Sequence, residues 1–196
     1  MRIVGLILAG GEGRRMGGAD KALLPLAGRP LLEHVIGRFA PQVDDLALSA
    51  NGDAARFAAF DLTVLPDAAS RGPLSGVLAG LDWASGLGAT ALVSAAVDTP
   101  FLPCDLVPRL VLAAEAAPRG VAVARCGGQD HPTFALWPTT LRAPLGDALS
   151  QGRYRVMDFA RAQGAAIAEF DDGSSFLNVN LPGDLAQAEA LLRGAA

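Results

Sequence analysis

The chain alternates short apolar runs with segments in which apolar residues recur every three or four positions. The first run, Ile3–Leu8, is apolar throughout and rich in branched side chains, as expected of a strand buried on both faces of a parallel sheet. Five later runs have the length and composition of strands: Leu46–Ala50, Leu62–Leu65, Thr90–Ala95, Val121–Ala124 and Thr133–Leu136.

Four segments show the apolar spacing of helices that pack on a sheet. Two of them open at Pro30 and Pro73, and proline is favoured in a first helical turn. A third follows Asp105, a suitable N-cap residue, and the last runs from about Pro182 to Leu192, before Gly194. This alternation predicts βαβ units and an α/β three-layer sandwich with a mostly parallel, Rossmann-like sheet.

Composition narrows the class of protein. A chain of 196 residues suits a single domain, 1–196, and 51% apolar and 18% charged residues suit a compact one. The net charge of −4 argues against a broad nucleic-acid surface, and apolar stretches such as Ala89–Val97 are too short to span a membrane. The apolar run at the start is also too short for a secretory signal, so we expect a cytoplasmic protein.

The two cysteines, Cys104 and Cys126, have no partners at metal-ligand spacing. In a reducing compartment we expect them to be free thiols that are buried or half-buried.

The segment from Leu8 to Lys21 is the strongest chemical signal in the chain. It combines five glycines with Arg14, Arg15 and Lys21, directly after the first predicted strand. Backbone N–H groups without intervening Cβ atoms can close around anionic oxygens at that edge of a sheet, so the segment predicts a phosphate-binding loop. A dinucleotide fingerprint and a P-loop are both excluded, because Met16 stands in place of a third glycine and Asp20 precedes Lys21. An ordinary surface turn is disfavoured, since most such turns are short and neutral.

Asp98 follows the apolar run that ends at Val97, so its carboxylate is expected at the same edge of the sheet. Mg²⁺ commonly uses one or two carboxylates together with substrate phosphates, which makes Asp98 a candidate metal ligand. The alternative role, a helix cap, is less suitable because Asp105 already fits the next cap.

Other polar segments carry weaker signals. Asp67 opens a second strand-to-helix loop and could accept a hydrogen bond from a base or ribose. His131, expected in a turn, and Arg153 and Arg155, expected to open a helix, could bind a second anionic substrate but are equally compatible with structural roles. Asn178 and Asn180 alternate before the last helix, where an asparagine is most simply a cap.

In order along the chain, five motifs resemble those of the molybdenum cofactor guanylyltransferases, within the nucleotidyltransferases of the nucleotide-diphospho-sugar transferase-like fold. These are the LAGG…RMGG.DK loop (8–21), GPL.G (72–76), DTP (98–100), DHPT (130–133) and F.NVN (176–180). The resemblance covers nearly the whole chain. It implies transfer of a guanylyl group from GTP to molybdenum-bearing molybdopterin, with release of pyrophosphate and with Mg²⁺ as cofactor.

The resemblance also implies roles for individual residues. Arg15 and Lys21 would hold the triphosphate and Asp98 would hold Mg²⁺, which makes these three the candidate catalytic residues. The GTP site in the N-terminal half would further include Leu8, Ala9, Gly10, Gly11, Asn51 and Asp67. The molybdopterin site in the C-terminal half would include His131, Arg153, Arg155, Asn178 and Asn180. Molybdoenzymes or their chaperones would be transient partners.

Two positions depart from the family pattern. Ser49 stands where an asparagine is expected, so a nucleotide contact there would pass to Asn51 or be lost, and Glu12 places an acidic side chain in the phosphate loop. Three alternatives stay open: a cytidylyltransferase for the same cofactor, a sugar or isoprenoid-precursor nucleotidyltransferase, and a nucleotide-binding carrier without catalysis. Gly10 favours GTP over CTP, because sister enzymes typically show LAAG and glycine allows a closer approach.

Overall fold

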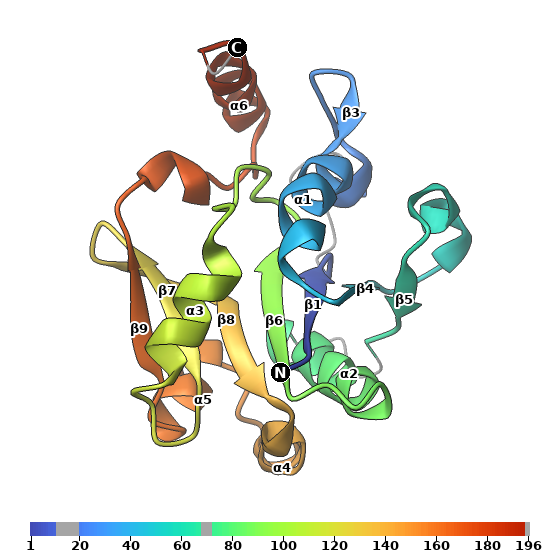
Figure 1. Ribbon diagram of the computed structural model, residues 1–196. Helices are drawn as coiled ribbons and strands as arrows, with labels where there is room; N and C mark the ends of the chain where they lie inside the picture. The colour runs from blue at the N-terminus through green and yellow to red at the C-terminus, as the bar shows by residue number, and fades with distance from the viewer. Residues whose placement is uncertain (11–19, 68–71, 195–196) are drawn as a thin grey trace.

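The computed structural model describes residues 1–10, 20–67 and 72–194, and its centre is a seven-stranded sheet (Figure 1). The strand order is β5-β4-β1-β6-β8-β7-β9. The strands are β1 (Ile3–Leu8), β4 (Asp45–Ser49), β5 (Thr63–Leu65), β6 (Ala91–Ala96), β7 (Ala122–Cys126), β8 (Gln129–Pro138) and β9 (Ala166–Phe170). Strand β8 runs antiparallel to both neighbours, β6 and β7, while every other neighbouring pair is parallel. The expected mostly parallel sheet is therefore confirmed.

The hairpin of β7 and β8 corrects one expectation. Thr133–Leu136 is predicted as a short strand with His131 in a turn, but β8 begins at Gln129 and includes His131. The turn lies earlier, at Gly127 and Gly128, whose φ angles of 56° and 78° suit the tight two-residue turn of a hairpin. A Gly-Gly pair between two apolar runs is the sequence signal that marks such a hairpin.

Helices cover both faces of the sheet, which confirms the three-layer arrangement. Figure 1 shows α1 (Leu31–Phe39) and α3 (Leu106–Ala114) on the near face. The other face is covered by α2 (Pro73–Gly86), α4 (Arg142–Ser150) and α5 (Val156–Ala162). Alternate residues of β1 join different cores, since Ile7 packs with the α1 and α3 side and Leu6 with the α2 side.

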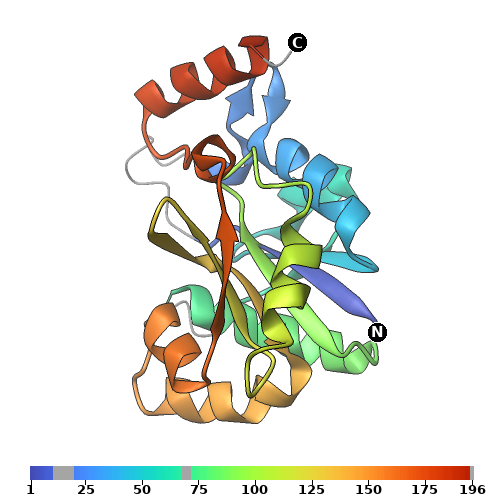
Figure 2. The same cartoon turned by 60° about the vertical axis from the view of Figure 1, so that its left-hand side comes forward.

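A smaller unit lies beyond the carboxyl ends of β1 and β6, formed by the hairpin β2 (Pro25–Leu26) and β3 (Arg29–Pro30) and the last helix, α6 (Pro182–Gly194). Figure 2 shows α6 beside this hairpin. Leu26, Phe101 and Val179 belong to the apolar cluster that joins them. Short 3-10 turns complete the chain: η2 (Lys21–Leu23), η3 (Ala40–Gln42), η4 (Ala54–Phe60), η5 (Thr139–Leu141) and η6 (Gly173–Phe176).

Asp105 is the N-cap residue of α3, as expected, but another side chain makes the hydrogen bond to the first turn. Asp105 occupies the N-cap position but its side chain makes no capping bond. Gln42, 65 residues earlier, accepts instead from the Val107 backbone N–H at 2.9 Å, and Asp105 pairs with Arg109 at 3.7 Å. Gln42 also donates to the Pro103 carbonyl at 2.9 Å, so one amide side chain ties the start of α3 to the end of α1.

Both cysteines are free, as expected, but Cys104 is exposed rather than half-buried. Cys126 is buried, and burial raises the pKa of its thiol. Within residues 1–10, 20–67 and 72–194, no helix has the length and apolar character needed to cross a bilayer.

Candidate functional site

The central feature of the site is an ion pair between Lys21 and Asp98. The Lys21 ammonium donates to Asp98 Oδ2 at 2.7 Å, and the two side chains keep 20% and 22% of their surface exposed. Asp98 follows β6, and Lys21 begins η2. Because β1 and β6 are parallel neighbours, their carboxyl ends meet at one edge, as the sequence predicts.

The segment that precedes α6 makes hydrogen bonds with this pair and with Thr99, the residue after Asp98. Val179 donates its backbone N–H to the Asp98 carbonyl at 2.7 Å, and Thr99 donates its hydroxyl to Asn178 Oδ1 at 2.7 Å. Lys21 also donates to the side-chain oxygen of Asn180. The structure thus brings Asn178 and Asn180 to the same place as Lys21 and Asp98.

A carboxylate in α6 holds the segment that contains the two asparagines. Asp184, in the first turn of α6, reaches back and accepts from the backbone N–H groups of Asn180 and Leu181, both at 2.8 Å. These bonds fix the backbone of the segment before α6, and the Asn180 side chain accepts from Lys21.

The nucleoside side of the expected GTP site lies at the ends of β1 and β4. Leu8 accepts from the Val97 N–H at 3.1 Å, and Ala9 donates to the Ser49 carbonyl at 2.9 Å, which fixes the path of the backbone into the loop. A Cβ built on Gly10 would meet no described atom within 4 Å. The described protein therefore leaves space beside Gly10, as a pocket for a base would require.

Asn51 and Asp67 are connected across two loops. Asn51 Oδ1 accepts from the Asp67 backbone N–H at 2.8 Å, and Asp67 Oδ2 accepts from the Ser75 hydroxyl at 2.7 Å. Ser49 lies apart from this contact: it is 2% exposed, and a Cβ built on Gly76 would lie 2.6 Å from its Oγ. At the position of the departure from the family pattern, the serine side chain is therefore packed under α2.

His131 lies on the C-terminal side of the same sheet edge. Its ring stacks on Phe176 with centroids 4.3 Å apart, and Phe176 opens the segment that leads to Asn178. Burial lowers the pKa of His131, and the neighbouring Asp130 carboxylate opposes that shift. Asp130 itself accepts from Arg125 at 2.6 Å, and this bond holds the pKa of the carboxyl below its usual range. Burial is the larger of the two effects, so the pKa of His131 lies below its ordinary value.

Arg153 and Arg155 are placed elsewhere. They lie between α4 and α5, as expected of residues that open a helix, and Arg155 is the N-cap of α5. Arg153 is exposed and donates to the Gln151 side chain at 2.7 Å. Both views show α4 and α5 at the end of the molecule opposite α6, so the structure does not gather these arginines around Lys21 (Figures 1 and 2).

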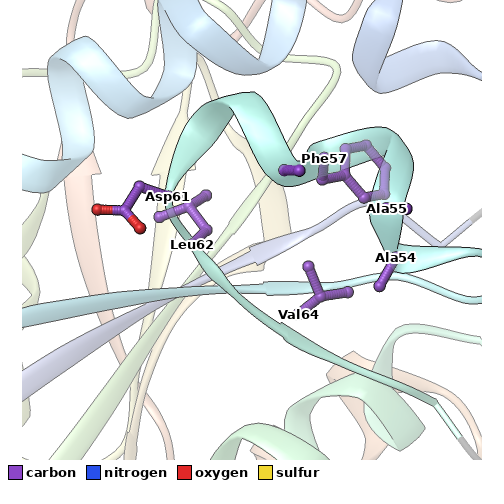
Figure 3. Close-up of a pocket in the computed structure, with 7 residues that line it drawn as sticks. Ala54, Ala55, Phe57, Asp61, Leu62 and Val64 are labelled. Carbon is purple, nitrogen blue, oxygen red and sulfur yellow. The ribbon is translucent and has the colours of Figure 1, made fainter.

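A hollow of about 460 Å³ lies outside this cluster, between η4 and the edge strand β5 (Figure 3). Its lining is Ala54, Ala55, Phe57, Ala58, Asp61, Leu62 and Val64. Apolar side chains and one carboxylate offer nothing to bind a triphosphate, so charge and hydrogen bonding identify the Lys21 edge as the candidate site instead.

The donor set at Asp98 suits a hard divalent cation. The Asp98 carboxylate and the Asn180 amide oxygen accept from Lys21, the Asn178 amide oxygen accepts from Thr99 next to Asp98, and Mg²⁺ prefers oxygen ligands. Among the described residues, no group of three or more His, Cys, Asp or Glu side chains could enclose a metal by itself.

Two expected site residues, Gly11 and Arg15, lie outside the described residues. Sequence reasoning missed Arg56, which contacts Asp20 beside Lys21 at 2.6 Å. A simple sequence signal was also missed: Lys21 is the only lysine among the 16 lysines and arginines of the sequence.

Comparisons with known proteins identify the family and the fold. Residues 5–166 match the family model described as the MobA-like NTP transferase domain. A molybdenum cofactor guanylyltransferase from Cereibacter sphaeroides is 60% identical over 193 residues, 98% of each chain, and one from Mesorhizobium japonicum is 50% identical over 97% of this chain and 96% of its own. The crystal structure of molybdopterin-guanine dinucleotide biosynthesis protein A from Archaeoglobus fulgidus shares the fold, with a TM-score of 0.77 at 22% identity over 97% of this chain and 99% of its own.

Proposed function

The chain belongs to the family of MobA-like NTP transferase domains and is a nucleotidyltransferase, and we propose that it transfers GMP from GTP to molybdenum-bearing molybdopterin. The products would be a guanine dinucleotide form of the cofactor and pyrophosphate. The names of relatives at 50–60% identity over nearly the full chain support this assignment. The observation that carries it is the half-buried Lys21–Asp98 pair at the carboxyl edge of β1 and β6.

Lys21 and Asp98 match the charges of the reaction. Lys21 would bind triphosphate oxygens, since the two protein acceptors in the described chain use two of the three donors of its ammonium. Asp98 would hold Mg²⁺ together with phosphate oxygens, and the ion would supply neutralisation of the charge on the leaving pyrophosphate. Arg15 would add a second cation from the phosphate loop.

The transfer needs no protein nucleophile. A terminal phosphate oxygen of molybdopterin attacks the α-phosphorus of GTP, and the bond from that phosphorus to the oxygen bridging to the β-phosphorus breaks. The electron pair of the broken bond leaves with pyrophosphate. Such a reaction is accelerated chiefly by positioning and charge stabilisation, and Lys21 supplies both.

We assign the two substrates to two parts of the sheet edge. GTP would lie over Leu8, Ala9, Gly10 and Gly11, with Asn51 and Asp67 on the nucleoside side. Molybdopterin would approach Asn178, Asn180 and His131. Asn178 accepts from Thr99 and Asn180 accepts from Lys21, while His131 stacks on Phe176. Arg153 and Arg155 lie apart from Lys21, so they would bind an anionic group only at the periphery of the molybdopterin site.

Each alternative has a feature against it. A cytidylyltransferase is disfavoured by Gly10, which stands where sister enzymes typically show the second alanine of LAAG, and a sugar or isoprenoid-precursor enzyme gives no reason for the DHPT and NVN motifs. A carrier that only binds nucleotide would not need the Asp98 carboxylate beside Lys21. We place the reaction in the cytoplasm, with transient transfer to molybdoenzymes or their chaperones.

The test follows the α-phosphate and the γ-phosphate of GTP separately, in a reaction with molybdenum-loaded molybdopterin and Mg²⁺. Label on the α-phosphate should enter the cofactor, whereas label on the γ-phosphate should appear in pyrophosphate. Asp98→Ala should abolish both transfers. Release of γ-label without α-label in the cofactor would contradict the proposed reaction, and full activity of Asp98→Ala would contradict the metal assignment.

A further inference from the structure

The guanidinium of Arg56 is held on all three of its nitrogens. Nε donates to Asp20 Oδ2 at 2.6 Å, Nη1 to the Asp53 carbonyl at 2.5 Å and Nη2 to the Asn51 carbonyl at 2.5 Å. Its Cζ lies 4.3 Å from the ring centroid of Phe57, which is buried and labelled in Figure 3. A surface arginine with 30% of its side chain exposed rarely needs so many fixed partners.

On one side this clamp reaches the residue that precedes Lys21. Asp20 Oδ2 pairs with Arg56, and Asp20 Oδ1 accepts from the Ala22 N–H at 3.1 Å, where it caps η2. With both oxygens held, the Asp20 side chain fixes the start of η2. Lys21 leaves from that fixed turn toward Asp98 and Asn180.

On the other side the clamp shapes the loop after β4. Arg56 binds the Asn51 carbonyl, while the Asn51 side chain accepts from the Asp67 N–H. Gly52 allows the loop to curl around the guanidinium, because its φ is +83° and a Cβ there would lie 3.2 Å from Arg56 Nη1. The backbone of this loop is therefore built around Arg56.

A continuous series of contacts thus runs from Asp67 through Asn51, Arg56 and Asp20 to Lys21. We propose that Arg56 is a positioning residue that fixes the spacing between the nucleoside side and the phosphate side of the GTP site. The inference rests on the proposed function, which places GTP between Asn51 and Lys21. Arg56 itself does not touch the reacting atoms in this account; it acts through Asp20 and the Asn51 carbonyl.

Lysine cannot replace arginine in this role. A guanidinium presents a rigid planar fork that meets three separate acceptors, whereas an ammonium is a point charge on a flexible chain. Arg56→Lys therefore keeps the charge and much of the bulk but loses the fixed geometry. Because small misplacements in an active site can cost as much as 100-fold in rate, the expected effect is kinetic.

The experiment compares Arg56→Lys with wild type and with Arg142→Lys. Arg142 is a matched control because it also bonds a carboxylate through Nε, that of Asp82, on helices α4 and α2 away from the site. We measure kcat, KM for each substrate, the Kd for GTP with Mg²⁺ and the melting temperature. Arg56→Lys should lower kcat/KM for GTP at least about 10-fold and leave KM for the molybdenum cofactor within about twofold. Arg142→Lys should match wild type.

A double variant tests the route through Asp20. If Arg56 acts by holding that carboxylate, Arg56→Lys combined with Asp20→Asn should lower kcat/KM for GTP little further than the more damaging single change. Full multiplication of the two losses would overturn the proposed route.

Other outcomes would overturn the role of Arg56 itself. These are Arg56→Lys kinetics equal to those of Arg142→Lys, or a loss of activity that only follows a loss of folded protein with both KM values unchanged. Wild-type protein that releases no pyrophosphate from GTP would contradict the proposed function instead. In that case the Kd for GTP still decides the role of Arg56, with an unchanged value counting against it.

Discussion

Lys21 and Asp98, 77 residues apart in the chain, are joined by a hydrogen bond of 2.7 Å at the carboxyl edge of the sheet. Hydrogen bonds hold the segments of both partners: the Asp98 carbonyl accepts from the Val179 N–H, and the Asp20 carboxylate accepts from the Ala22 N–H at the start of η2. A cation and an anion are thus kept together in a half-buried position. This preorganisation suits a site in which the cation binds phosphate and the carboxylate holds a metal.

Removal of the Lys21 ammonium tests its role in phosphate binding. Lys21→Ala should lower kcat/KM for GTP by roughly 10- to 150-fold, which corresponds to the loss of a charge-assisted hydrogen bond of about 1.5–3 kcal/mol. Steady-state kinetics with GTP varied at saturating cofactor measures the effect. Kinetics equal to wild type would refute the assignment of Lys21.

The absence of other lysines from the sequence offers an independent check on the same residue. Reductive methylation should modify Lys21 and the N-terminal amine alone, and GTP with Mg²⁺ should slow modification of Lys21 without slowing that of Met1. Peptide mass spectrometry measures the two sites in one sample, so the N-terminal amine serves as the internal control. Equal rates with and without GTP would show that nucleotide does not cover Lys21.

Gly10→Ala tests nucleotide selectivity. An added methyl would meet no described atom within 4 Å, so the free energy of unfolding should change by less than about 0.5 kcal/mol. If a base occupies this space, the methyl should lower kcat/KM for GTP by about 10-fold and affect CTP less, because a methyl-sized change in a pocket is worth about 1–3 kcal/mol. Unchanged use of GTP by the variant would place the base elsewhere.

Gly76→Ala tests the close packing of α2 on the sheet. Its Cβ would lie 2.6 Å from Ser49 Oγ and 3.0 Å from Leu8 Cδ2, so denaturant unfolding should show a loss of about 1–3 kcal/mol. Ser49→Ala removes the nearer atom and should recover part of the loss. Gly37→Ala in α1 is the matched control: with nothing within 4 Å, it should gain about 0.5–1 kcal/mol. Equal effects of the two glycine variants would refute the packing argument.

The lowered pKa of His131 predicts a pH dependence of stability. Burial favours the neutral ring in the folded state, while the unfolded chain takes up a proton at a pKa of about 6.5. The free energy of unfolding should therefore decrease as the pH falls below about 6.5. His131→Phe keeps a ring against Phe176 and removes the proton, so its stability should fall less over pH 7 to 5. Parallel curves for the two proteins would contradict this account.

The parts of the structure that local patterns determine were predictable. Apolar runs define β1 and β6, and because parallel strands end at one edge, Asp98 could be placed beside the loop that contains Lys21. The Gly127-Gly128 hairpin carries an equally local signal that places His131 in a strand.

Contacts between distant residues were not predictable in this way. The cap of α3 comes from Gln42, and the partner of Asp20 is Arg56, 36 residues away. Each contact depends on how elements pack in three dimensions, which spacing along the chain does not encode. Strand β9 was missed for a related reason, since its short run Ala166–Phe170 includes Glu169 and gains its strand conformation by pairing with β7.

The most direct test of the central claim is pyrophosphate release with molybdenum-loaded molybdopterin and Mg²⁺, measured side by side with GTP, CTP, ATP and UTP. A guanylyltransferase should release pyrophosphate with GTP, far less with the other three nucleotides, and none when the cofactor is omitted. Selectivity for CTP would identify the sister activity, and silence with all four nucleotides despite measurable GTP binding would contradict catalysis by this chain.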